Sequence, residues 1–155
     1  MANKILELLE PSAVCLNLTA ADSKEVIDHL SKQLLEAGYV RDSFANAAME
    51  REKVMPTGLP LSGEVNAAIP HTDIEHVVKC GLALATLKQP VIFHNMVATD
   101  EEVKVSLVFV MALDQPKAQV EMLKEIAGVL QRPEVIDELM KAKNYKDVRA
   151  ALKAV

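Results

Sequence analysis

The sequence predicts an α/β fold in which a mixed β-sheet of about five strands is sandwiched by helices. Residues 107–111 are continuously apolar, which is typical of a central strand covered on both faces. Apolar residues recur at helical spacing before and after the strand-rich middle of the chain, which indicates helices for the two faces. Because half of the 155 residues are hydrophobic, the chain can form one sizeable core, and we expect a single domain over residues 1–155.

The first part of the chain is expected to form a strand, two helices and a stiff loop. Asp22 and Ser23 offer N-caps for the first helix, and Gly38 ends it as a left-handed cap. The second helix begins near Asp42 and ends before Pro56, because the residue that precedes a proline disfavours helical backbone. Two prolines and two glycines then indicate the loop. The expected segments are 14–18, 22–38, 42–55 and 56–63.

The rest of the chain is expected to form four strands followed by helices. The first of these strands ends at Pro70, because proline donates no amide hydrogen bond to a sheet. Pro133 starts a helix, since proline is favoured in the first helical turn. The expected strands are 64–69, 81–87, 91–93 and 103–112, and the expected helices are 116–130, one from residue 133 onward, and 145–152.

Composition and charge argue against several classes of function. The formal net charge is −5, and the aromatic residues are three Phe and two Tyr. Nucleic-acid backbones require basic patches, so no nucleic-acid partner is expected. A mildly acidic protein instead suits a basic protein partner. The longest apolar run is far too short to span a membrane, and the N-terminus has no signal-peptide pattern, so we expect a cytoplasmic protein.

Neither the cysteines nor the histidines show a metal-binding pattern. Cys15 and Cys80 each lie in an apolar run, and we expect both to be buried free thiols. The sequence contains no CxxC, HxH or HExxH motif, so no metal or cofactor is expected. We interpret His29, His76 and His94 as helix, surface and turn residues.

The candidate reactive residue is His71, which follows Pro70 at a strand exit and precedes Thr72 and Asp73. Thr72 and Asp73 can hold the N–H of one ring nitrogen and leave the other nitrogen with a free lone pair. The chain has no serine elbow of the GxSxG type, so His71 is itself a candidate nucleophile. Phosphorus is its natural electrophile, because a phosphoramidate bond is labile enough to pass the group onward. The alternative is a structural turn histidine.

A transferred phosphoryl group needs a cation, and arginine offers a permanent planar charge. Of the four arginines, Arg51 lies just before the loop that contains the prolines and glycines. The alternative for Arg51 is an exposed charge within the helical run 50–53.

Three motifs together resemble a known family: Arg51-Glu52, Pro56-Thr57-Gly58 and Ala68-Ile69-Pro70-His71. They are similar to the IIA component of the sugar phosphotransferase system, in its fructose/mannitol class. Residues 56–61 and 69–73 most resemble those of galactitol-type IIA proteins. The resemblance covers nearly the whole chain and implies the family's mixed sheet sandwiched by helices.

The resemblance also implies roles for individual residues. His71 matches the histidine that carries the phosphoryl group, and Arg51 matches the arginine that steadies it. Thr57 matches a loop residue close to the site, and amides of the loop at Thr57 and Gly58 would bind the phosphate. Gln119 stands where many relatives have a second active-site histidine. Its amide can donate a hydrogen bond to a phosphoryl oxygen but carries no charge.

The function that the resemblance implies is phosphoryl transfer without a cofactor or metal. The phosphocarrier HPr would hand a phosphoryl group to His71, and a cysteine of a IIB component would take it for uptake of a galactitol-like sugar. Contact with the membrane would be indirect, through the IIB/IIC complex. Leu59, Leu61 and Ile69 are expected to form the docking face for the partner proteins.

Two alternatives stay open. The same fold serves nitrogen-type IIA proteins, which regulate through protein contacts and transport no sugar, although residues 56–61 argue against this function. A binding module that has lost phosphotransfer is the second alternative, although an intact His71 with Arg51 argues against it.

Overall fold

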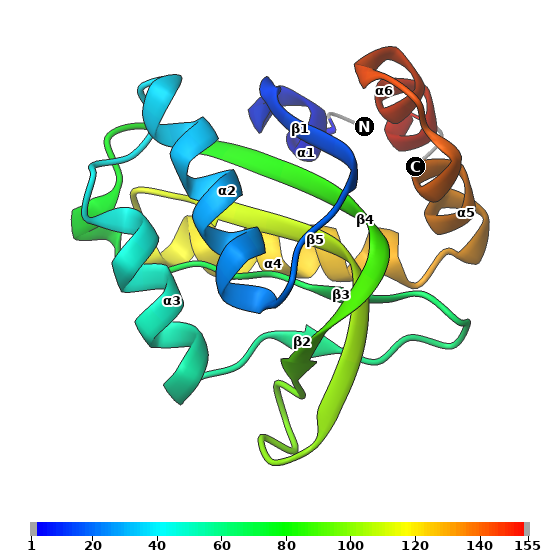
Figure 1. Cartoon of the computed structure of the whole chain (residues 1–155). Coiled ribbons are helices and arrows are strands. Elements are labelled where there is room, and N and C mark those ends of the chain that lie inside the picture. The colour runs from blue at the N-terminus through cyan, green and yellow to red at the C-terminus, as the bar shows by residue number, and fades with distance from the viewer. Residues whose placement is uncertain (1–2, 154–155) are drawn as a thin grey trace.

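A five-stranded mixed sheet forms the centre of the computed structural model, which describes residues 3–153 (Figure 1). The strands are β1 (Leu9–Leu18), β2 (Gly58–Leu59), β3 (Asn66–Ala68), β4 (Gly81–His94) and β5 (Glu102–Ala112). Their order in the sheet is β1-β4-β5-β3-β2. The β1–β4 and β3–β5 pairs are parallel, and the β4–β5 and β2–β3 pairs are antiparallel. The predicted mixed sheet is therefore confirmed.

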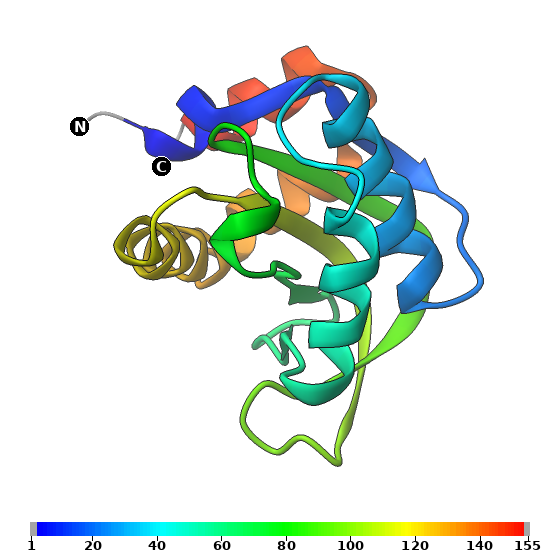
Figure 2. The ribbon, with the colours of Figure 1, turned by 90° about the vertical axis from the view of Figure 1, so that its left-hand side faces the viewer.

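Helices cover both faces of the sheet, as predicted. They are α1 (Lys4–Leu8), α2 (Ser23–Glu36), α3 (Phe44–Val54), α4 (Pro116–Leu130), α5 (Pro133–Lys141) and α6 (Tyr145–Lys153), with a 3-10 helix η1 at Ile74–His76. Residues of α2 and α3 pack on one face, and those of α1, α4, α5 and α6 pack on the other (Figure 2). None of the helices within residues 3–153 is both long and apolar enough to cross a bilayer.

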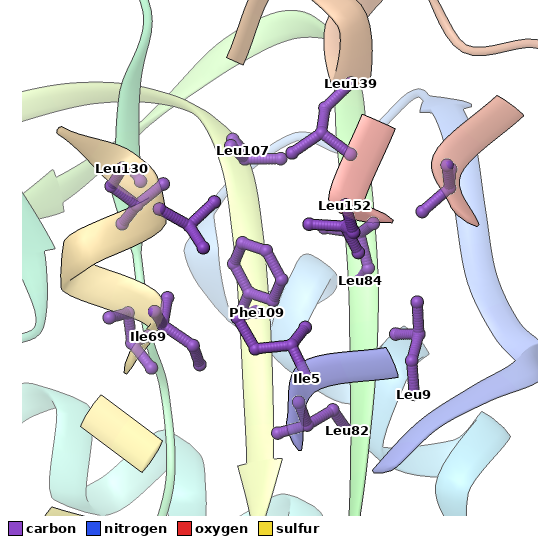
Figure 3. Packing of buried hydrophobic residues seen from close by; sticks show 14 of the residues in the cluster. Ile5, Leu9, Ile69, Leu82, Leu84, Leu107, Phe109, Leu130, Leu139 and Leu152 are labelled. Atoms are coloured by element: carbon purple, nitrogen blue, oxygen red, sulfur yellow. The ribbon is translucent and has the colours of Figure 1, made fainter. Parts of the chain in front are cut away.

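Alternate residues of the two longest strands point to opposite faces and form two separate cores. Leu84 of β4 and Phe109 of β5 pack with the side chains of α1, α4, α5 and α6 (Figure 3). Their neighbours Ala83 and Val108 belong to the core shared with α2 and α3. The run at 107–111 is apolar throughout because helices cover both sides of β5.

The predicted strands at 81–87 and 91–93 are one continuous strand, β4. The three residues between them, 88–90, are exposed and include a proline, which makes them resemble a turn in the sequence. In the structure the pairing of β4 with β5 shifts register between Thr86 and Val91. A proline is tolerated at such an irregularity, because its missing N–H breaks no regular ladder hydrogen bond.

Three other predicted boundaries also differ. The strand at 14–18 is only the end of β1, which begins five residues earlier and follows α1. The strand expected at 64–69 contains only the three residues of β3, and the loop at 56–63 contains β2. The five-residue α1 depends on tertiary contacts, because its cap Asn3 also donates to the Leu152 carbonyl at 2.7 Å.

The two cysteines are half-buried rather than buried as predicted. Burial raises the pKa of the Cys15 thiol. The Cys80 thiol donates to Asp114 Oδ1 at 3.1 Å, so it lies at a partly polar position near the surface. Burial also raises the pKa of Cys80, and both thiols therefore stay protonated at neutral pH.

Candidate active site

A cleft of about 300 Å³ lies between α3, the loop that follows it, the β4–β5 connection and α4. It brings together three of the predicted site residues, His71, Arg51 and Thr57. Two others flank the lining: Gly58 follows Thr57 in the chain, and Gln119 is hydrogen-bonded to the residue after His71. The remaining lining residues are mostly apolar: Val54, Met55, Pro56, Met96, Thr99 and Leu123.

The imidazole of His71 is held by the backbone of its own segment. Its Nδ1 lies 2.8 Å from the carbonyl oxygen of Ile69. Because a carbonyl only accepts hydrogen bonds, Nδ1 carries the proton of the neutral ring and Nε2 keeps a free lone pair. The partner of this N–H is therefore the Ile69 carbonyl, and not Thr72 or Asp73 as the sequence predicts.

The backbone on the N-terminal side of His71 is fixed from two directions. The Ile69 amide donates to Oγ1 of Thr57 at 3.2 Å. The Met111 amide of β5 donates to the Pro70 carbonyl at 3.1 Å, which extends the sheet pairing past the end of β3. The histidine is thus oriented before any partner binds, which lowers the entropy cost of aligning it for reaction.

Gln119 fixes the backbone on the other side of His71. It lies in the first turn of α4, and its Nε2 donates to the Thr72 carbonyl at 2.9 Å. A side-chain amide has two N–H groups, so one is left for another acceptor. Since Gln119 is neutral, Arg51 supplies the permanent positive charge among the described residues of the cleft lining.

The protonation state of His71 suits a nucleophile. Burial lowers the pKa of the ring below its ordinary value of 6.5. The hydrogen bond to Ile69 and the charge of Asp73 oppose this effect, whereas the charge of Arg51 adds to it. The ring is therefore neutral at pH 7, and its lone pair is available.

Arg51 reaches the cleft from α3 with its side chain 33% exposed, so it is half-buried rather than the exposed helix charge of the alternative interpretation. Its Nη1 lies 3.6 Å from Oδ1 of Asp73, whose side chain is 68% exposed. An ion pair this long and this exposed contributes little to stability. The Nε of Arg51 is buried and has no hydrogen-bond partner among the described residues. Because the Nη1 contact with Asp73 is long and exposed, that end of the guanidinium can turn to an anionic group.

Thr57 and Gly58 are both engaged in contacts within the fold. Thr57 is 3% exposed, and its amide and hydroxyl donate to the two carboxylate oxygens of Glu52 at 2.7 and 2.9 Å. The Thr57 amide, predicted to bind phosphate, is thus already occupied. A Cβ on Gly58 would lie 2.5 Å from the His94 carbonyl oxygen, so this position requires glycine.

Comparison with known proteins assigns the chain to a family. The family model described as "Phosphoenolpyruvate-dependent sugar phosphotransferase system, EIIA 2" matches residues 7–155. The chain belongs to this family. As an EIIA protein it is 30% identical over 123 residues to the PTS system galactitol-specific EIIA component of Escherichia coli (strain K12), which covers 79% of this chain and 81% of the relative.

Two further relatives of this EIIA protein belong to mannitol systems. It is 27% identical over 147 residues to the PTS system mannitol-specific EIICBA component of Vibrio cholerae, which covers 93% of this chain and 21% of the relative. The Escherichia coli mannitol IIA, solved in complex with phosphorylated mannitol IIB, has a TM-score of 0.76 at 26% identity, over 95% of this chain and 98% of that chain. The protein is therefore a phosphotransferase component of the sugar phosphotransferase system, a system in which IIA and IIB components form complexes.

The surface around the cleft of this EIIA protein carries apolar side chains that are more than half exposed. They are Val54, Met55, Val97 and Val120. Val54 and Met55 line the cleft, Val97 follows the lining residue Met96, and Val120 lies one helical turn before the lining residue Leu123 on α4. The predicted docking residues are different: Ile69 is fully buried, and Leu59 and Leu61 line a separate pocket beside Leu130.

Glu52 is a residue of this site whose role the sequence does not predict, because it lies in a run of charged helix residues. Burial raises its pKa from 4.5 to about 7, against the lowering effects of the Thr57 hydrogen bonds and of the charges of Arg51 and His94. The pKa of Glu52 in the folded state thus lies above that in the unfolded state. Its contribution to stability is complete below the unfolded pKa and is lost as the pH rises through about 7.

Through Glu52, the free energy of unfolding is expected to fall by up to about 3 kcal/mol between about pH 4 and pH 8. Urea unfolding of the wild type and of Glu52→Gln at both pH values measures this fall in the free energy of unfolding. The variant should lack the share of the fall that comes from Glu52. The matched control is Glu50→Gln, since Glu50 lies on the same helix in an exposed ion pair with Lys53. An identical pH dependence in the wild type and Glu52→Gln would contradict the raised pKa.

Proposed function

We propose that this EIIA protein carries a phosphoryl group on Nε2 of His71, between phospho-HPr and a cysteine of a IIB component. One observation supports this proposal above the others. The Nδ1–H of His71 is bonded to the Ile69 carbonyl, so the lone pair of Nε2 is free in a cleft that Arg51 also lines.

The transfer consists of two displacements at phosphorus. The Nε2 lone pair attacks the phosphohistidine of HPr; a new N–P bond forms as the donor N–P bond breaks, and its electron pair returns to the donor imidazole. A IIB thiolate then attacks the same phosphorus, and the bonding pair returns to Nε2 of His71. Phosphoryl transfer asks little covalent chemistry of the protein, so catalysis is chiefly positioning and charge neutralisation.

The other candidate residues have different parts in the proposed reaction. Arg51 neutralises the charge of the equatorial phosphoryl oxygens. The second N–H of Gln119 donates to one of these oxygens. Thr57 and Gly58 support the site rather than the phosphate, because the Thr57 amide is bonded to Glu52 and Gly58 is packed against His94.

The exposed apolar residues around the cleft form the proposed docking surface for HPr and IIB. Contacts of this kind dissociate readily. A carrier that binds two partners in turn requires this. The similarity to a galactitol-specific component supports a galactitol-like sugar as the transported class. We propose that the protein acts in the cytoplasm and meets the membrane only through the IIB/IIC complex.

Incubation with phosphoenolpyruvate, enzyme I and HPr is expected to add one acid-labile phosphate per chain, measured by intact-protein mass spectrometry. The phosphorylated protein should then pass the group to a galactitol-type IIB in a panel of purified IIB proteins. Labelling without transfer to any IIB would favour the nitrogen-type regulatory function. A chain that stays unlabelled beside a labelled control IIA would leave only a binding module.

A further inference from the structure

The carboxylate of Glu52 binds a buried residue of the fold and is not part of the cleft lining. Its Oε2 accepts the Thr57 amide at 2.7 Å, and its Oε1 accepts the Thr57 hydroxyl at 2.9 Å. Both oxygens therefore bind the same residue of the loop that follows α3. Arg51, the preceding residue, lines the cleft instead. Arg51 and Glu52 are adjacent on α3, but the first faces the cleft and the second binds the loop that follows the helix.

The hydrogen bonds continue from Glu52 to the reactive ring. A hydroxyl has a single hydrogen, and Thr57 donates it to Glu52, so its oxygen is an acceptor toward the Ile69 amide at 3.2 Å. The carbonyl of Ile69 in turn accepts Nδ1–H of His71 at 2.8 Å. Above its pKa of about 7 the Glu52 carboxylate is ionised and can only accept hydrogen bonds, so it then sets the direction of the hydroxyl.

We propose that Glu52 and Thr57 are positioning residues that hold the backbone of Ile69, and through it keep His71 in the Nδ1–H tautomer with Nε2 directed at the phosphoryl donor. This inference rests on the proposed function of His71. Neither residue touches the phosphoryl group. Without the Thr57 hydroxyl, the Ile69–Pro70 segment keeps its bond to Met111 but loses the one to Thr57. The Ile69 carbonyl then holds Nδ1–H less firmly, and the fraction of rings with a free Nε2 lone pair falls.

A simpler role for the same contacts is to attach the loop to α3, so that they contribute to stability alone. The two roles make different predictions for the ring of His71. An attachment role changes the unfolding temperature and leaves the tautomer of the folded protein unaltered. A positioning role changes the tautomer, and the maximal rate of phosphorylation falls while the KM for phospho-HPr changes little.

The test compares Thr57→Val, Thr57→Ser and Glu52→Gln with the wild type and with Glu50→Gln as the exposed control on the same helix. Long-range ¹H–¹⁵N NMR of the unphosphorylated protein at about pH 8 reports the tautomer of His71. The wild type and Glu50→Gln are expected to show Nδ1–H. Thr57→Val and Glu52→Gln should show a mixture with Nε2–H and a phosphorylation rate lower by about 10-fold, and Thr57→Ser should restore both readouts.

An unchanged tautomer in Thr57→Val and Glu52→Gln, or a wild-type rate of phosphorylation in both, would overturn the proposal. If Thr57→Val does not fold, Glu52→Gln and Thr57→Ser decide the outcome by the same two readouts. Failure of the proposed function looks different: the wild type itself would stay unphosphorylated, whereas the NMR comparison would still report whether Glu52 and Thr57 orient the ring.

Discussion

Replacement of His71 with alanine is expected to abolish phosphate incorporation without unfolding the protein. Among residues 3–153 the ring makes one hydrogen bond, to the Ile69 carbonyl, and the bonds of the Pro70 and Thr72 carbonyls do not involve it. The variant should therefore keep a cooperative thermal transition close to that of the wild type. After incubation with phosphoenolpyruvate, enzyme I and HPr, its mass spectrum should show no phosphorylated species.

The matched control for this loss is His29→Ala. His29 lies on α2, outside the cleft lining, so the control removes an imidazole and should be labelled like the wild type. The expectation rests on His71 having a free Nε2 in the cleft, because it is the one histidine among the described residues that line the cleft. Labelling that persists in His71→Ala would move the phosphorylated residue elsewhere in the chain.

The fold was largely predictable because the longest strands and helices carry strong hydrophobic patterns. The apolar run at 107–111 of β5 and the amphipathic α2 and α4 are recognisable from residue spacing alone. The short elements were not. Helix α1 has five residues and depends on the contact between Asn3 and Leu152, which brings together the two ends of the chain. A contact across such a separation leaves no local pattern.

The site residues themselves were more predictable than the hydrogen bonds that hold them. The motifs pointed to Arg51, Thr57 and His71, and the structure brings these residues to one cleft. The acceptor of the His71 N–H could not be found, because it is a backbone carbonyl and every residue has one. The contact of Glu52 with Thr57 was hidden for another reason: burial of a helix charge depends on tertiary packing, which a run of charged residues does not show.

Replacement of Arg51 with alanine is expected to slow phosphoryl transfer from phospho-HPr by about 10-fold or more, since charge-assisted contacts to a phosphoryl group are among the strongest hydrogen bonds. The transfer rate of Arg51→Lys should lie between those of the wild type and Arg51→Ala, because lysine keeps the charge but loses the planar fork. Lys53→Ala is the control: it removes a cation of the same helix that pairs with Glu50 in an exposed position. Rapid-quench measurement of the phosphorylated chain gives the rates.

The loss in Arg51→Ala should appear in the maximal rate rather than in the KM for phospho-HPr. The Nε of Arg51 is buried without a partner among the described residues, and the contact of its Nη1 with Asp73 is long and exposed. The Nη1 end of the guanidinium can therefore leave Asp73 for an incoming phosphoryl oxygen, which gains a charge-assisted hydrogen bond. That gain is largest when charge spreads over the equatorial oxygens during transfer. A change confined to KM would instead make Arg51 a docking residue for HPr.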